Sequence, residues 1–193
     1  MKDKPCFILD NERELISECI SGNRIMQNTL YAQFASVMIV VCFRYAKSRS
    51  DAEEILQEGF IKVFTCLHQY KFIGSLEGWI KKIMINCALQ RLRSKNLMYP
   101  IVHSETAAEE FADKDGILDD ITAKELILLI QNLPNMCRLV FNLYVFESMK
   151  HREIAKLLNI SEGTSKSNLH DARILLQQRL SEQNSFINLN SGA

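Results

Sequence analysis

The chain has 193 residues, 47% of them apolar, which is enough for one or two small domains with hydrophobic cores. Its 23 Lys and Arg residues balance its 23 Asp and Glu residues, which excludes a protein that holds DNA through net positive charge alone. Because Gly (7) and Pro (3) are scarce while Leu, Ile, Glu, Lys and Gln are plentiful, we predict an all-α protein.

Nothing in the sequence predicts secretion, membrane insertion or a bound metal. The first 15 residues are charged and contain no signal-peptide core, and the longest apolar run, 37–43, is far below the roughly 20 residues of a membrane helix. Six cysteines, at positions 6, 19, 42, 66, 87 and 137, form no Cys-x-x-Cys or zinc pattern. We therefore expect reduced core cysteines, no cofactor, no direct membrane insertion and a cytoplasmic location.

A first helical domain is predicted over residues 12–95. Within it, "SDAE" (Ser50 to Glu53) fits a capping box that opens an amphipathic helix. The pattern breaks at Gly74, after which Ser75 can cap a second helix. That helix has five bases against one acid, and it follows a loop with aromatic residues, a combination that suits melted single-stranded DNA. For Trp79 we prefer the alternative of a core anchor, because Trp is heavily buried on average.

An acidic linker is predicted over residues 96–121, where apolar periodicity fades and Pro100 and Gly116 interrupt the chain. It contains one base and seven acids, whereas residues 1–95 contain 14 bases and 10 acids. The neutral total therefore conceals two mildly basic blocks on either side of an acidic segment.

A second helical domain, residues 122–182, contains a predicted helix-turn-helix. Ala155 is the small residue of the first helix, Asn159 suits a left-handed turn, and Ser161 is a fitting N-cap. Leu169, Ala172, Leu176 and Leu180 are expected to face inward. Residues near the start of the second helix are expected to face outward into the DNA major groove; they are Ser161, Thr164, Ser165, Lys166, Asn168 and His170, with Arg173 one turn later. The alternative is an ordinary helical hairpin with a solvated face.

Residues 51–95, which include "DAEEILQEGF" and "GWIKKIMINCALQRLRSK", resemble conserved region 2 of bacterial sigma factors of the extracytoplasmic-function (ECF) group. Residues 133–180, which include "HREIAKLLNISEGTSKSNLHDAR", resemble region 4 of the same proteins. The two blocks occur in the family's order. The resemblance implies a non-enzymatic subunit that directs RNA polymerase core enzyme to promoter DNA, commonly under the control of an anti-sigma factor.

The resemblance also implies roles for individual residues. Region 2 docks on the polymerase core through a face that corresponds to Asp51, Glu54, Gln57 and Glu58. The melted −10 element is held by a loop and a basic helix, which here correspond to Phe72, Ile73, Gly74, Ser75, Trp79, Lys82, Asn86, Arg91 and Arg93. Region 4 reads the −35 element, which places the outward residues of 161–173 in the groove. One departure concerns position 165, which is often Val in the family and is Ser here.

A different class of protein is the alternative: a one-component helix-turn-helix regulator whose N-terminal helices bind a small ligand or form a dimer. Such a regulator would form a stable homodimer on a palindromic operator. An enzyme has little support, because the sequence contains no Gly-rich phosphate loop, metal cluster or nucleophile–base motif.

Overall fold

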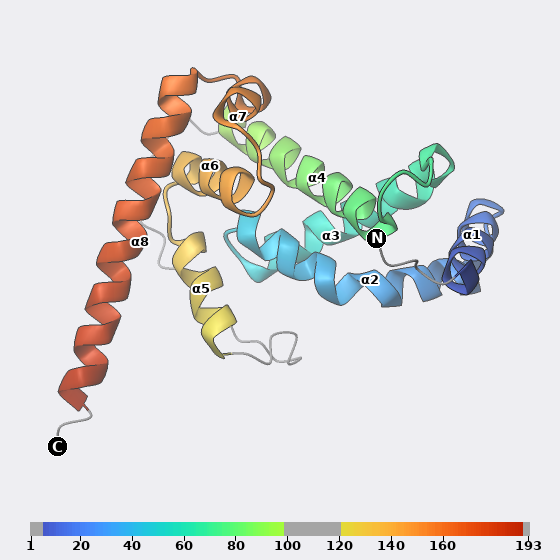
Figure 1. Ribbon diagram of the computed structural model, residues 1–193, viewed down its shortest axis with the longest axis horizontal. Coiled ribbons are helices and arrows are strands. Elements are labelled where there is room, and N and C mark those ends of the chain that lie inside the picture. The colour runs from blue at the N-terminus through green and yellow to red at the C-terminus, as the bar shows by residue number, and fades with distance from the viewer. Residues whose placement is uncertain (1–5, 99–120, 191–193) are drawn as a thin grey trace. The chain divides into compact units, whose positions relative to one another are not determined.

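The computed structural model describes residues 6–98 and 121–190, and the side chains of residues 11–92 and 124–182. These residues form eight α-helices and one short 3₁₀ helix, without a strand in the described ranges, so the all-α prediction is confirmed (Figure 1). The chain divides into two compact units, residues 1–105 and 106–193. Most of the predicted acidic linker lies outside the described residues.

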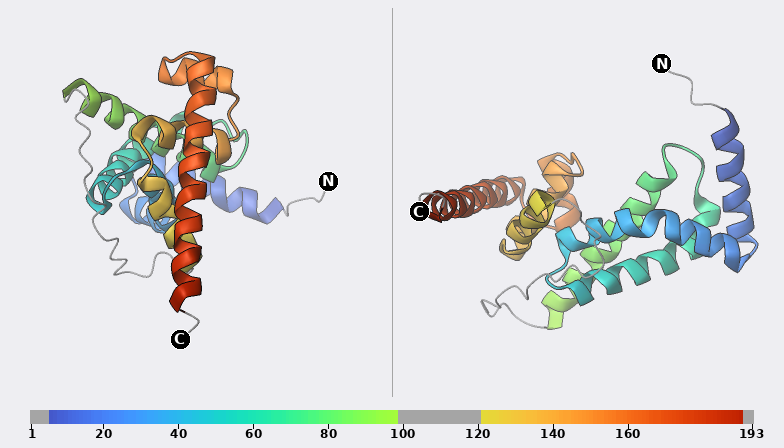
Figure 2. Two further views of the ribbon diagram at one scale, coloured as in Figure 1. Left: turned by 90° about the vertical axis from the view of Figure 1, so that its left-hand side faces the viewer. Right: turned by 90° about the horizontal axis from the view of Figure 1, so that it is seen from below.

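The first unit is a helical bundle. It contains α1 (Cys6–Ile20), α2 (Arg24–Tyr45), α3 (Arg49–Cys66), the 3₁₀ helix η1 (Leu67–Gln69) and α4 (Leu76–Met98). Helices α2, α3 and α4 pack against one another, and α1 crosses the N-terminal end of α2 (Figure 2). The helical block therefore begins at Cys6, before the predicted start at residue 12.

The core of the first unit is apolar and draws on all three long helices, with Met38 and Phe43 from α2, Val63 from α3 and Ile80 and Met84 from α4 fully or almost fully buried. By length and composition alone, α2 could cross a membrane. Its buried side chains, from Leu30 to Tyr45, contribute to the core of this bundle.

The predicted capping box at Ser50 is wrong. Helix α3 begins at Arg49, and its N-cap is Ser48, which has an extended backbone and whose side chain accepts a hydrogen bond from the Asp51 amide at 3.1 Å. Ser50 is already helical, and Glu53 pairs with Arg49 instead of reaching back to a cap. Both serines offer the same acceptor, so composition alone does not choose between them.

The second unit contains α5 (Ile121–Gln131), α6 (Asn135–Val145), α7 (His151–Leu158) and α8 (Glu162–Asn190). Helix α8 packs against the other three (Figure 1). The buried cluster between them consists of Leu129, Leu133, Cys137, Ala172 and Leu176. Leu180 is 46% exposed, so its predicted inward orientation is wrong. The apolar stripe of α8 reaches this core only as far as Leu176.

The turn between α7 and α8 has the predicted geometry. Asn159 is left-handed, with φ 55° and ψ 49°, and the amide of Ile160 donates to the Ala155 carbonyl at 3.0 Å. The Ser161 hydroxyl then accepts from the Thr164 amide at 2.9 Å and caps α8. The chain therefore reverses in a few residues and presents the first turns of α8 as a continuous surface.

The α5–α6 joint contains a buried arginine. Arg138 is fully buried, and its Nη1 donates to the carbonyl oxygen of Gln131, the last residue of α5, at 3.0 Å. Its Nη2 lies 3.4 Å from the side-chain oxygen of Asn135. A cation thus satisfies a helix C-terminus, where the carbonyl groups lack helical partners.

Candidate nucleic-acid interfaces

The start of α8 has an exposed polar surface. Ser161, Thr164, Lys166, His170 and Arg173 are exposed, as expected for residues that meet DNA. Lys166 forms an i,i+4 ion pair with Glu162 at 3.0 Å between exposed side chains. Such a surface pair is weak and screened by salt, so the ammonium group can exchange it for a phosphate at little cost.

Ser165 does not belong to this surface. It is fully buried, and its Oγ lies 3.0 Å from Nδ1 of His151 at the start of α7. The predicted outward orientation is therefore wrong: the hydroxyl ties the two helices of the helix-turn-helix together. The His151 ring in turn stacks on the Tyr144 ring of α6, with centroids 4.7 Å apart. Sequence reasoning missed both His151 and Tyr144.

Asn168 is half-buried, and its amide is used inside the protein. Its Nδ2 donates to the Thr164 carbonyl at 2.8 Å, and its Oδ1 lies 3.5 Å from the Cys137 sulfur. A bidentate contact to adenine needs both ends of this amide. The contacts with α6 and with its own helix already use one donor and one acceptor position of the Asn168 amide.

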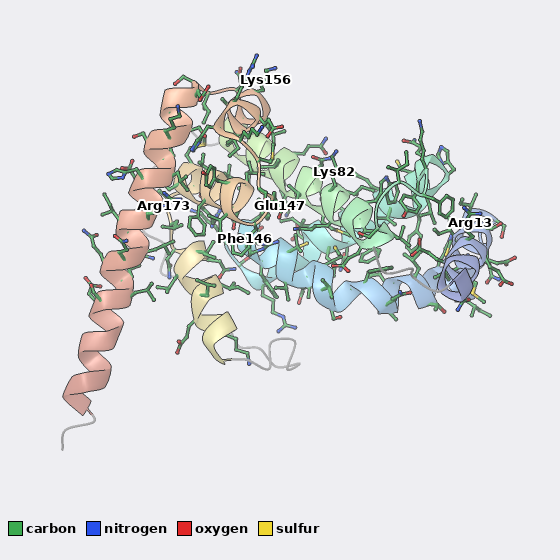
Figure 3. The ribbon with its side chains drawn as sticks, in the orientation of Figure 1. Arg13, Lys82, Phe146, Glu147, Lys156 and Arg173 are labelled. Carbon is green, nitrogen blue, oxygen red and sulfur yellow. The ribbon has the colours of Figure 1, made fainter. Side chains whose placement is uncertain are left out.

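Arg173 lies one turn further along α8, and its guanidinium sits over the Tyr144 ring, 5.8 Å from the centroid (Figure 3). This cation–π contact orients an exposed charge without neutralising it. Tyr144 of α6 therefore contacts both His151, by ring stacking, and Arg173, by a cation–π contact. Through these two contacts it supports the α7–α8 motif.

The loop before α4 is a shaped aromatic segment. Tyr70 is buried and its hydroxyl donates to the Gly74 carbonyl at 3.0 Å. Phe72 has a left-handed backbone, φ 58°, and Gly74 has φ 84°. Between these two residues, Ile73 is 82% exposed. The loop thus presents an apolar side chain to solvent on a backbone that its own hydrogen bond holds in place.

The Phe72 ring lies between two supports. The Tyr70 ring is 5.0 Å away between centroids, and the Arg13 guanidinium of α1 lies 5.2 Å from the Phe72 centroid. Arg13 therefore contacts the loop from a helix that lies about 60 residues earlier in the chain (Figure 3). No pattern of neighbouring residues predicts this contact. A left-handed backbone is costly for a bulky residue, which makes such external support necessary.

Trp79 packs against Tyr70, with centroids 5.6 Å apart, but it is only half-buried and so is not a fully buried core anchor. Ser75 caps α4 as predicted: its Oγ accepts from the Gly78 amide at 3.1 Å. Lys82 and Asn86 are exposed on the same helix. The side chain of Arg93 lies outside those that the structure describes.

Arg91 contacts the acidic face of α3. Its guanidinium pairs with Glu54, with Glu58 at 3.1 Å and with Asp51 at 3.7 Å. Gln57, the remaining member of that face, is exposed. One residue expected at melted DNA, Arg91, is therefore paired in the folded chain with the face expected to dock on the polymerase. Among the described side chains, no group of His, Cys, Asp or Glu residues could hold a metal ion.

Family models match both units. The model "Sigma-70 region 2" matches residues 30–97, and "Sigma-70, region 4" matches residues 123–176. Together these segments span well over half of the chain, in the order of the family. The chain belongs to the sigma-70 family, in its ECF group. Its aromatic loop and basic α4 lie in region 2 of this sigma factor, and its helix-turn-helix lies in region 4.

The curated relatives that match this chain are sigma factors as well. The chain is 24% identical over 184 residues to the RNA polymerase sigma-H factor of Pseudomonas aeruginosa, with 89% of this chain and 94% of that protein covered. It is 29% identical over 152 residues to the ECF RNA polymerase sigma factor SigW of Bacillus subtilis, with 72% and 81% covered. The sigma factor RpoE of Bartonella quintana, solved in complex with the anti-sigma factor NepR, is 14% identical, with 80% and 96% covered and a TM-score of 0.49.

Proposed function

We propose that this sigma factor brings RNA polymerase core enzyme to specific promoters through two separate DNA contacts. The first domain, residues 12–95, docks on the core and holds the melted −10 element. The second domain, residues 122–182, reads the −35 element as duplex DNA. The observation that carries this proposal is the presence in one sigma-70 chain of a preformed aromatic loop and a capped helix-turn-helix.

The −10 contact is proposed for the loop 72–75 and for Lys82 and Asn86. A base that has left the stack can pack on an apolar surface while cations hold the backbone. Ile73 offers such a surface, and Lys82 of α4 offers an exposed cation. Trp79 contributes by packing on Tyr70, and in this proposal it does not touch DNA.

The −35 contact is proposed for Ser161, Thr164, Lys166, His170 and Arg173, which are all exposed. Lys166 and Arg173 hold phosphates, and the shorter polar residues approach base edges. Two such cations supply little affinity alone, because affinity for duplex DNA grows with the number of phosphates neutralised. Docking on core polymerase supplies the rest by holding region 4 close to its site.

Control by a protein partner completes the proposal. An anti-sigma factor would mask both DNA-binding domains and thereby prevent promoter binding. The protein itself carries out no chemical reaction, and it works in the cytoplasm, where the polymerase and the promoter are found.

Transcription in vitro with purified core enzyme tests the proposal. Core enzyme plus this sigma factor should give a discrete start site on some members of a panel of candidate promoters, and core alone should give none. Lys82→Ala should reduce transcription, whereas Arg24→Ala, which removes an exposed cation at the start of α2, should not. Absence of any complex with core enzyme would contradict the proposed function.

A further inference from the structure

Arg91 lies at the junction of two helices and three carboxylates. Its side chain comes from α4, is 20% exposed, and meets carboxylates from successive turns of α3. Asp51, Glu54 and Glu58 are spaced by three and four residues, so they line one side of that helix. A guanidinium carries several donors in a fixed plane and can serve more than one carboxylate at once.

Without a cation, the three acids would repel one another. Like charges at i,i+3 and i,i+4 on a helix are unfavourable and drive flexible side chains apart. Arg91 turns this repulsion into a network in which the carboxylates share one partner. Glu54 and Glu58 stay about half exposed while they pair with Arg91, so their carboxylates can still meet a basic partner surface.

The same contacts make Arg91 a poor candidate for holding DNA. To bind a phosphate, its guanidinium would have to leave three carboxylates, and the phosphate would have to approach those same carboxylates. Lys82 and Asn86, which are exposed on the same helix, meet no such obstacle in the described contacts.

We propose that Arg91 is a positioning residue of the polymerase-docking face on α3 and that it makes no contact with the melted −10 strand. Its guanidinium holds Glu54 and Glu58 in a fixed row, so that the face meets core polymerase already ordered. The inference rests on the proposed function, because it takes core enzyme as the partner of this face.

The chain offers a matched control for this role. Lys62 of α3 donates from Nζ to Oε1 of Gln90 on α4 at 2.7 Å, one position before Arg91. Lys62→Ala removes a cation and an α3–α4 hydrogen bond at the same junction, but none of the ion pairs described for the three acids. A loss specific to Arg91 therefore cannot come from a general loosening of the two helices.

The experiment measures two affinities on full-length protein. Labelled sigma factor is titrated with core polymerase, and the resulting holoenzyme, formed at saturating core, is titrated with a promoter fragment whose −10 region is already open. Arg91→Gln should weaken core binding about tenfold, and Arg91→Lys should restore part of it because one cation remains. Lys62→Ala should leave core binding within about twofold of wild type. DNA binding by saturated holoenzyme should be unchanged in all three.

A double-variant cycle tests whether Arg91 acts through its partner. If it does, Arg91→Gln combined with Glu58→Gln should cost less core affinity than the two separate losses added together. Strict additivity would overturn a role through Glu58.

Other outcomes are equally decisive. Unchanged core affinity in Arg91→Gln, or a loss confined to the open-promoter titration, overturns the inference while the proposed function stands. Failure of wild-type protein to bind core rejects the proposed function itself. If Arg91→Gln unfolds, as thermal denaturation would show, Arg91→Lys decides between the readings: reduced core affinity with intact DNA binding supports positioning, and the reverse excludes it.

Discussion

Gly59 of α3 lies directly against Met84 of α4: a Cβ built on this glycine would come within 2.1 Å of the Met84 sulfur. Met84 is fully buried, so its thioether has no solvent to move into. The absence of a side chain at position 59 therefore sets how closely the two helices of region 2 approach.

Gly59→Ala should destabilise the protein by about 1–3 kcal/mol, because the added methyl overpacks a filled core. Urea unfolding followed by circular dichroism measures the change in the free energy of unfolding. Met84→Ala removes the clashing atoms, so the double variant Gly59→Ala/Met84→Ala should lose less than the sum of the single losses. Full additivity would show that α3 and α4 adjust without contact between these residues.

Asn159 should tolerate glycine and resist branched residues. Its left-handed backbone, φ 55°, suits Gly and Asn, whereas a β-branched side chain costs about 1–2 kcal/mol there. Asn159→Gly should therefore unfold at a denaturant concentration close to that of wild type, and Asn159→Val at a clearly lower one. Equal stability of the two variants would argue against the left-handed turn.

Two substitutions at Phe72 should separate the effect of its backbone conformation on stability from the effect of its ring. Phe72→Ala keeps the positive φ and loses the ring, whereas Phe72→Gly also relieves the backbone, so the glycine variant should be more stable than the alanine variant by about 1 kcal/mol. If the ring shapes the loop for the −10 strand, both variants should bind an open promoter more weakly than wild type when assembled with core. Wild-type binding in both would remove Phe72 from the proposed site.

Substitution of Lys166 should affect DNA binding, whereas substitution of its neighbour Ser165 should affect stability. Lys166→Ala should weaken −35 duplex binding of the holoenzyme about equally for all sequences and lower the salt slope by about one. Ser165→Ala should leave the salt slope unchanged and reduce stability by about 1 kcal/mol, since it removes the buried bond to His151. A salt slope that falls on Ser165→Ala would place its hydroxyl at the DNA after all.

The buried thiol of Cys42 should make the folded protein less stable at alkaline pH. Burial raises the pKa of its thiol from 9.0 to about 12, with further contributions from Cys87. Below pH 9 the thiol is neutral in both states, so the full stability is present. Between pH 9 and 12 the thiol loses its proton in the unfolded state and keeps it in the folded state. Deprotonation therefore stabilises the unfolded state, and the free energy of unfolding falls.

Urea unfolding of wild type and Cys42→Val at pH 8 and pH 10.5 isolates this effect, because every other titrating group is common to both proteins. Stability should fall more steeply with pH in wild type than in Cys42→Val. Parallel losses would mean that Cys42 does not resist deprotonation in the fold.

Local chemistry let the sequence predict two of the helix caps and the tight turn, although it chose the wrong serine at the start of α3. Asn159, Ser161 and Ser75 each act within four residues of themselves, so short patterns contain the whole signal. The same reasoning failed at Ser165, although it lies four residues before the inward Leu169 and so shares its stripe. The polarity of a serine favours exposure, whereas the Val that is frequent at this position in the family favours burial.

Contacts between distant segments were beyond the sequence. Arg91 meets carboxylates that precede it by 33 to 40 residues, and Arg13 meets a ring 59 residues later. Periodicity places each residue on a face of its own helix, but it does not state which helix that face meets. From sequence alone, Arg91 on its basic helix therefore fits a DNA contact. The fold shows that three carboxylates lie beside it.

The buried guanidinium of Arg138 makes the end of one helix depend on a residue of the next. The carbonyl of Gln131 accepts a hydrogen bond from a side chain seven positions downstream. Any insertion or deletion in the α5–α6 turn would displace this donor, so the length of the turn and the identity of residue 138 must change together. An engineer who grafts either helix alone into another scaffold would separate the donor of this hydrogen bond from its acceptor.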